Sequence, residues 1–131
     1  MIAIDTSVLV RYLVGSPKAQ AARARRVIEG EKAIGLPLVA LVECAHVLRT
    51  QYELAPDAII GLLIELLQRR NIELLGMRTE AAVGLLVRAR ALPGRPLPDA
   101  LIVAAAVEAG ALPVVTFDRD MHRYGVATRT P

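Results

Sequence analysis

The segment Met1-Ile-Ala-Ile-Asp5-Thr-Ser-Val-Leu-Val10 begins with a short apolar run, which leads into an acidic residue and then into a second apolar stretch. The first run predicts a buried strand over residues 2–4. Thr6 or Ser7 offers a hydroxyl oxygen that can cap a helix over residues 8–14, and Gly15-Ser-Pro17 ends that helix. A strand that leads directly into a helix is typical of the repeating β-α pattern of α/β proteins.

The same alternation continues along the rest of the chain. Beyond the first strand and helix, it predicts strands over residues 33–36, 71–75, 112–116 and 126–128, helices over residues 17–29, 38–51, 56–69, 79–91 and 98–109, and a helical turn over residues 119–124. Thr79 is the expected cap of its helix, and the prolines of residues 92–98 predict a loop. We therefore predict one α/β domain over residues 1–131, with three α/β/α layers and a central parallel sheet of four to five strands.

Composition narrows the class of protein. The chain has 131 residues, of which 54% are hydrophobic and 3% aromatic, so its core consists of aliphatic side chains. No apolar run approaches the ~20 residues of a membrane span, and the N-terminus lacks a signal-peptide pattern. We therefore expect a cytoplasmic protein without a membrane segment. Because Cys44 is the sole cysteine of the sequence, intramolecular disulfides and cysteine-based zinc sites are excluded.

Four carboxylates lie beside apolar runs, namely those of Asp5, Glu43, Asp99 and Asp118. An acid that loses water beside a core segment is costly unless something compensates. If the fold brought the four together, mutual repulsion would raise their pKa values, and a bound cation would relieve it. Asp5 and Asp118 also follow predicted strands, where ligands of parallel sheets bind.

Carboxylates without cysteine or paired histidine favour a hard ion such as Mg²⁺ or Mn²⁺. Such an ion supports hydrolysis of phosphodiester bonds. Among the 16 basic residues, 14 are arginine, which suits phosphate contacts. We expect Arg11, which follows Asp5, and Arg95, which precedes Asp99, to bind the substrate backbone, and Arg88 and Arg90 are further candidates.

The motifs Asp5-Thr-Ser-Val-Leu-Val, Leu41-Val-Glu43, Asp99-Ala-Leu-Ile and Thr116-Phe-Asp118 resemble those of PIN-domain nucleases. In length and helix layout the chain looks most like the toxin ribonucleases of VapBC toxin–antitoxin modules. The resemblance implies a Mg²⁺- or Mn²⁺-dependent endoribonuclease in which the four acids are catalytic. It implies a homodimer and a small antitoxin that covers the site. Toxin and antitoxin together would then form a hetero-oligomer.

The same resemblance assigns roles within the site. Asp5, Asp99 and Asp118 would be metal ligands, with Asp5 and Asp99 the foremost, and Thr6 and Thr116 would support the site. Many members carry Ser or Thr shortly before the helix glutamate, whereas this chain has none between Pro37 and Val42. That departure bears on the hydrogen bonds around Glu43.

Each acid also has a purely structural interpretation. Asp5 can be a helix N-cap, Asp99 can complement a helix dipole, and Asp118 can be a turn residue. Glu65 is a useful comparison, because it lies among apolar residues on a helix face with Asp57 and Gln68 and should be solvated. The wide apolar face of that helix is either deeply buried or an interface with a second copy or an antitoxin.

Other functions fit the sequence less well. A phosphatase with an aspartyl nucleophile would need an acid in place of Ser7 and a nearby lysine, and a receiver domain fails for similar reasons. A ribonuclease that uses His46 and His122 leaves the four acids unexplained. The non-enzymatic alternative is a degenerate PIN-fold binding module, although such a module would be expected to have lost one of the acids.

Overall fold

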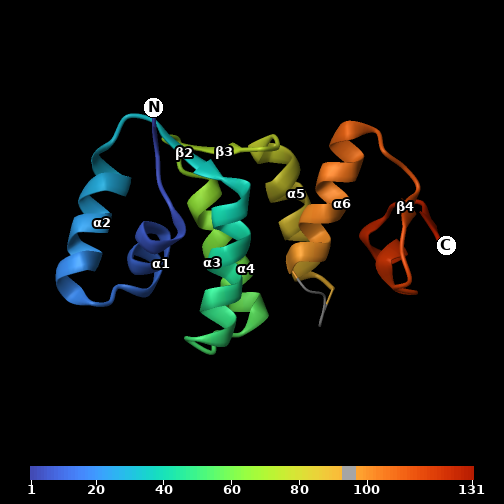
Figure 1. The fold of residues 1–131 in the computed structure, drawn as a ribbon, viewed down its shortest axis with the longest axis horizontal. Coiled ribbons are helices and arrows are strands. Elements are labelled where there is room, and N and C mark those ends of the chain that lie inside the picture. Colours follow the sequence, from blue (N-terminus) through green and yellow to red (C-terminus); the bar gives the residue numbers. More distant parts are fainter. Residues whose placement is uncertain (93–96) are drawn as a thin grey trace. The chain divides into compact units, whose positions relative to one another are not determined.

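The computed structural model describes residues 1–92 and 97–131, which form two compact units (Figure 1). Unit 1 consists of residues Met1–Gly76 and unit 2 of residues Met77–Pro131. The prediction of one domain over the whole chain stays a prediction.

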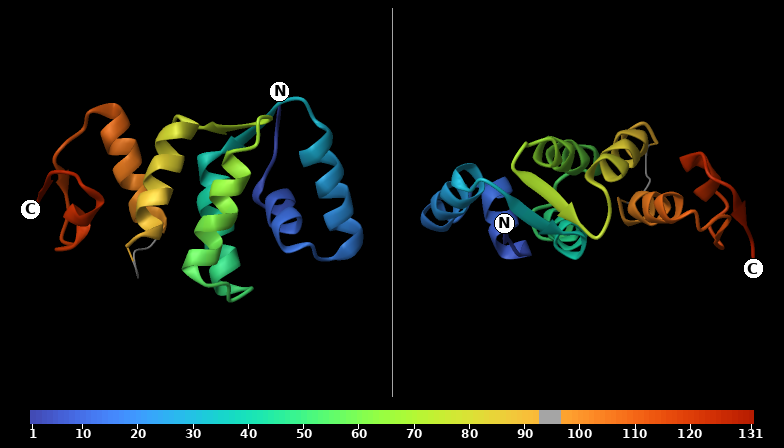
Figure 2. Two further views of the ribbon diagram at one scale, coloured as in Figure 1. Left: turned by 180° about the vertical axis from the view of Figure 1, so that it is seen from behind. Right: turned by 90° about the horizontal axis from the view of Figure 1, so that it is seen from above.

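Unit 1 contains a parallel sheet with β2 in the middle, β1 on one side and β3 on the other. The register pairs Ile2 with Ile34 and Ile34 with Ile72. Its elements are β1 (Ile2–Ala3), α1 (Thr6–Val14), α2 (Lys18–Gly30), β2 (Ile34–Pro37), α3 (Leu38–Thr50), α4 (Pro56–Leu67) and β3 (Ile72–Leu75). Helix α1 packs on α2 and α3, and α3 packs on α4 (Figure 2).

The central strand β2 has space for only small side chains at its midpoint. A Cβ atom added to Gly35 would lie 2.7 Å from Cδ1 of Leu75 and 3.1 Å from the sulfur of Met1. Ile34 and Leu36, on either side of it, are fully buried. Such a strand, apolar and buried on both faces, is what a parallel sheet covered by helices requires.

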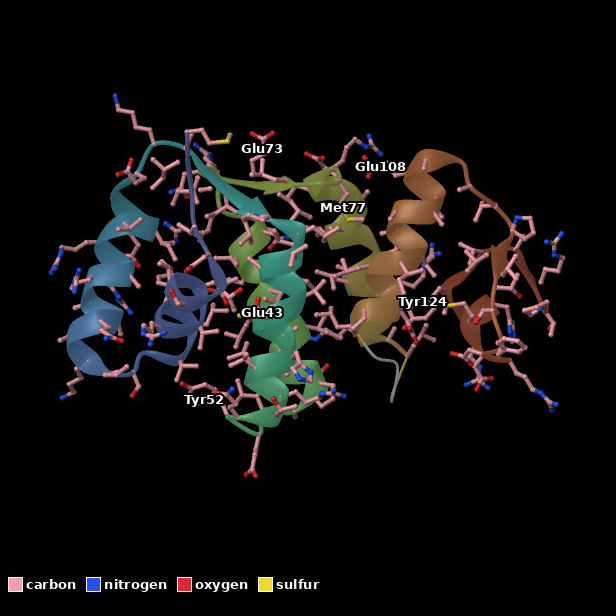
Figure 3. The ribbon with its side chains drawn as sticks, in the orientation of Figure 1. Glu43, Tyr52, Glu73, Met77, Glu108 and Tyr124 are labelled. Atoms are coloured by element: carbon pink, nitrogen blue, oxygen red, sulfur yellow. The ribbon has the colours of Figure 1, made fainter. Side chains whose placement is uncertain are left out.

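Unit 2 pairs two helices and a small parallel sheet. Its elements are α5 (Thr79–Arg90), α6 (Leu97–Ala109), β4 (Val114–Val115), the 3-10 helix η1 (Met121–Tyr124) and β5 (Thr128–Arg129). Strand β4 pairs with β5 in parallel, and α5 and α6 pack on each other and on η1. Tyr124 of η1 (Figure 3) is fully buried. Its carbonyl oxygen accepts a hydrogen bond of 2.5 Å from Nη1 of Arg88.

The predicted α/β class with parallel strands is confirmed, and the fold is consistent with three α/β/α layers. Most element boundaries agree with the prediction to within a few residues. Among the candidate caps of α1, the structure selects Asp5 over Thr6 and Ser7. The predicted cap of α5 is wrong, because Arg78 precedes that helix in place of Thr79. The predicted loop over residues 92–98 ends earlier, because α6 begins at Leu97, and residues 93–96 lie outside the described residues.

The apolar face of α4 is buried in the core, which is one of the two alternatives that the sequence leaves open. The buried residues of this face are Ile59, Ile60, Leu63, Leu66 and Leu67. Leu63 is 0% exposed, whereas Glu65 is exposed, as predicted. The face that Leu63 occupies therefore belongs to the core and is not an open surface.

The helices of the described residues are all too short or too polar to cross a membrane.

Candidate active site

Asp5 lies just beyond β1 and is the N-cap of α1. Its Oδ1 accepts hydrogen bonds from the Val8 backbone N–H at 3.2 Å and from the Ser7 hydroxyl at 2.6 Å. The first N–H groups of a helix have no partner within the helix, so the Val8 bond satisfies one of them. The structural interpretation of Asp5 is therefore correct, and it does not exclude a chemical role, because the carboxylate is exposed.

These hydrogen bonds also keep the Asp5 carboxylate ionised. The Ser7 hydroxyl first, and the Val8 backbone N–H next, hold the pKa of Asp5 below its ordinary value of 3.8, and the positive charge of Arg11 contributes less. A hydrogen bond that the charged form accepts always lowers the pKa of a carboxyl group. At neutral pH this group is therefore a fixed negative charge at the end of a strand.

Glu43 is the second acid of unit 1, and a residue next to Asp5 holds it. The Thr6 hydroxyl donates a hydrogen bond of 3.0 Å to Oε2 of Glu43, across 37 positions of sequence (Figure 3). This bond joins the first turn of α1 to the middle of α3, and Glu43 is exposed there. Thr6, which the sequence predicts to be a supporting residue, is thus placed between the segments that carry the two acids.

Cys44 follows Glu43 and is fully buried. Burial raises the pKa of its thiol to about 12, with a smaller contribution from the negative charge of Glu43. A thiol in that state is protonated at neutral pH and acts as a small apolar side chain.

In unit 2, Asp118 lies in the turn that follows β4. Its backbone N–H donates to the Thr116 hydroxyl at 2.9 Å, and its Oδ1 accepts from the Asp120 backbone N–H at 2.9 Å. The Thr116 hydroxyl therefore holds the backbone of the turn at Asp118. The hydrogen bond from the Asp120 backbone N–H holds the Asp118 carboxylate. Asp120 Oδ1 forms an ion pair with Nη2 of Arg123 at 3.5 Å.

Asp99 occupies the first turn of α6, as predicted, and is partly buried. A carboxylate in the first turn of a helix is stabilised by the positive end of the helix dipole. The structure thus gives two acids to each unit, Asp5 and Glu43 to unit 1 and Asp99 and Asp118 to unit 2.

The arginines differ from the expectation more than the acids do. Arg11 is engaged within unit 1, since its Nε donates to Oε1 of Gln20 and its Nη1 donates to the Ser7 carbonyl at 3.1 Å. Arg88, a further candidate for the substrate backbone, instead donates to the Tyr124 carbonyl and so holds η1. Arg95 lies outside the described residues. Roles for Arg11 and Arg95 in substrate binding stay predictions.

The donor set suits a hard cation. The groups that each unit offers beside its strand ends are carboxylate and hydroxyl oxygens, and these are the ligands that Mg²⁺ and Mn²⁺ prefer. Within either unit, no three His, Cys, Asp or Glu side chains among the described residues group closely enough to hold a metal. A carboxylate that stays ionised, as Asp5 does, nevertheless fits such an ion without the cost of releasing a proton.

The sequence did not predict one partner of the four acids, Ser7, or the contact between Arg78 and Glu108 in unit 2. The Ser7 hydroxyl donates to Asp5 in place of capping α1, although an acid followed two positions later by serine is a local signal for such a bond. The Glu108 carboxylate accepts from the Arg78 backbone N–H at 3.0 Å, and Arg78 Nε pairs with it at 3.1 Å (Figure 3). Because 30 positions separate Arg78 and Glu108, no local sequence pattern predicts that contact.

The model of the PIN domain family matches residues 2–127 of the chain. The chain therefore belongs to the PIN domain family. PIN domains have a nuclease-type fold, and they are typically metal-dependent. A comparison with curated proteins gives no match.

Proposed function

We propose that this protein is a Mg²⁺- or Mn²⁺-dependent endoribonuclease that uses Asp5, Glu43, Asp99 and Asp118. Membership of a family of nuclease-type fold supports the proposal, and so does the retention of all four acids. The single observation that carries it furthest is the arrangement around Asp5. Two hydrogen bonds fix the direction of an exposed carboxylate at a strand end, and the residue beside it donates a hydrogen bond to a second acid.

In the proposed reaction Asp5, Asp99 and Asp118 would hold the metal. When bound, it would supply Lewis-acid chemistry, which lowers the pKa of water and offsets charge on a phosphate. Ser7 and Val8 fix the direction of the Asp5 carboxylate through Oδ1. Thr6 orients Glu43, and Thr116 fixes the turn that carries Asp118.

The experiment uses purified full-length protein and a mixed pool of single-stranded RNA. We expect cleavage with Mg²⁺ or Mn²⁺ and none with a chelator. Asp5→Asn should remove the activity, while Glu65→Gln, which changes an exposed acid elsewhere in unit 1, should not. Cleavage that survives both the chelator and Asp5→Asn would overturn the proposal.

We further propose that the protein is the toxin of a type II toxin–antitoxin module of the VapBC kind. It would act in the cytoplasm as a homodimer, and a small antitoxin would cover its active site. This finer proposal is supported by the resemblance of the four acidic motifs and by the length of the chain. Expression of the wild type alone should arrest growth, and expression of Asp99→Asn should not.

Equal growth with both proteins would contradict the toxin role. If purified wild type also failed to cleave RNA, the protein would instead be a binding module of PIN fold. Light scattering on the purified wild type tests the homodimer directly, and a monomer mass at micromolar concentration would contradict it.

A further inference from the structure

The outward face of α2 carries four cations, and the one acid of the helix, Glu29, lies at its C-terminal end. Lys18, Arg23, Arg25 and Arg26 are all exposed, and no Asp or Glu occurs between Lys18 and Ile28. With 3.6 residues per turn these four side chains occupy one side of the helix, opposite the buried Ala24 and Ile28. We call this side the basic face of α2.

Four cations and one acid leave the basic face with a net positive charge. Its four cations form no ion pair among the described residues, although Glu29 lies four positions after Arg25. An arginine placed before a glutamate at this spacing has the less favourable orientation relative to the helix dipole. Arg23 and Arg26 are like charges three positions apart, which destabilises a helix.

The ends of α2 add to this cost. Pro17 at the N-cap makes no side-chain hydrogen bond, and the first turn of α2 has no acidic residue. The electrostatic cost of the helix is therefore not offset within unit 1. A polyanion bound from solution would offset it.

The basic face suits a nucleic-acid backbone better than a protein. Ala19 and Ala22, both exposed, lie between the cations, so an anion can approach the helix closely. The exposed large apolar side chains of unit 1 are Met1, Ile2, Val39, Tyr52 and Leu75, and α2 contributes none of them. The centre of a protein interface is apolar and depleted in charge, whereas contacts to phosphates are made by Arg and Lys.

The basic face is also attached to the segment that carries Asp5. Helix α2 packs on α1, and Arg11 of α1 donates to Gln20 of α2. Asp5 caps the other end of α1, which at nine residues is about 14 Å long. We propose that the basic face of α2 binds the phosphates of single-stranded RNA. The inference rests on the proposed function only in taking RNA as the substrate.

The test measures binding of a labelled single-stranded RNA oligonucleotide to the full-length protein in chelator, so that no cleavage occurs. R23Q/R26Q is compared with R49Q/R70Q, which removes the same charge from two other exposed arginines of unit 1. Each phosphate contact on a single strand contributes about 0.7 to the slope of log affinity against log salt. R23Q/R26Q should therefore lower the slope by about 1.4, and its affinity should fall about sevenfold less than that of wild type between about 50 and 200 mM salt.

R49Q/R70Q should keep the wild-type slope, and R23K/R26K should restore it. Because glutamine is a good helix former, circular dichroism should show folded protein for each variant. Equal slopes for R23Q/R26Q and wild type would overturn the inference. It would also be overturned if R23Q/R26Q kept its RNA binding and lost only binding to labelled poly-glutamate, because the face would then serve an acidic protein.

The outcomes separate this inference from the proposed function. If R23Q/R26Q lowers the salt slope of RNA binding and wild type does not cleave RNA with Mn²⁺, the proposed function fails and the inference stands. If RNA is cleaved and R23Q/R26Q leaves both KM and the salt slope unchanged, the inference alone fails. Where both hold, R23Q/R26Q should raise KM and leave kcat unchanged.

Discussion

Glu43 and Glu65 are two acids in the middle of apolar helices, and their surroundings differ. Glu43 of α3 is exposed and accepts a hydrogen bond from Thr6, a residue 37 positions earlier. Glu65 of α4 is also exposed, but it makes no hydrogen bond or ion pair with any described residue. The comparison teaches that apolar neighbours in sequence do not identify a functional acid. What distinguishes the two is whether another segment of the chain orients the carboxylate.

The difference between Glu43 and Glu65 is tested most directly by exchanging each carboxylate for an amide. Glu43→Gln should lower kcat for RNA cleavage by a hundredfold or more, on the order of what active-site partners contribute. Glu65→Gln should change it less than about twofold, since an exposed acid without partners has little to lose. Steady-state cleavage of one RNA substrate measures both. Similar losses in the two variants would mean that the Thr6 contact is not the distinguishing feature.

A buried apolar residue of α4 and an exposed one of α3 should differ in how much they contribute to the free energy of unfolding. Leu63→Ala on α4 removes a side chain that is 0% exposed and should lower the free energy of unfolding by about 3 kcal/mol. Val39 on α3 is 75% exposed, so Val39→Ala should change it by less than about 0.5 kcal/mol. Urea denaturation followed by circular dichroism gives both values. A small effect at Leu63 would return α4 to the alternative of an interface.

The importance of the hydrogen bond that orients Glu43 is tested by changing its donor, Thr6. Thr6→Val keeps the shape of the side chain and removes the hydroxyl that donates to Glu43. Cleavage should fall about tenfold, the lower end of what an outer partner of a metal site contributes. Thr6→Ser keeps the hydroxyl and should recover most of the activity. A loss of equal size in Thr6→Ser would point to packing of the threonine methyl group.

The smallest expected effects separate the two roles of Asp5. Asp5→Ala removes the N-cap of α1 and should lower the free energy of unfolding by about 1 kcal/mol, whereas Asp5→Asn keeps a capping oxygen and should change it by a few tenths. Both variants should lose cleavage. Equal stability of the two would show that the cap does not support α1.

The stability difference between wild type and Asp5→Asn should also depend on pH. The pKa of Asp5 is lowered in the folded state, so its ionised form contributes stability above about pH 3.8. That contribution disappears as the pH falls through the lowered pKa. The difference in urea midpoint between the two proteins should therefore narrow below about pH 3.8, and a difference that widens there would contradict the hydrogen-bonding pattern.

Local chemistry made much of the fold predictable. The alternation of apolar runs with Gly and Pro located the strands and helices, because those signals act over a few residues. The caps were harder, since Asp5, Thr6 and Ser7 each carry an oxygen that can bind the first turn of α1. The structure chooses Asp5, and the Ser7 hydroxyl then donates to it.

The contacts that hold the candidate site were beyond local reasoning. The sequence around Thr6 does not predict its contact with Glu43, and the sequence around Arg88 does not predict its contact with the Tyr124 carbonyl. Each pair is separated by more than 30 positions. Charge alone predicts that Arg88 contacts substrate, whereas its guanidinium lies against Gly125 and the Tyr124 carbonyl. A Cβ atom added to Gly125 would lie 2.6 Å from Nη1 of Arg88, and the φ angle of 79° at that glycine also disfavours any other residue.

The double use of Asp5 has a consequence for how such a gene loses its activity. Asparagine caps a helix about as well as aspartate, and the two codons differ by one base. A single transition at this codon would therefore abolish the proposed chemistry and leave a chain that still folds and accumulates. Under the proposed toxin role, cells that escape growth arrest by this route would carry an inert copy, and that copy would still compete for whatever the active protein binds.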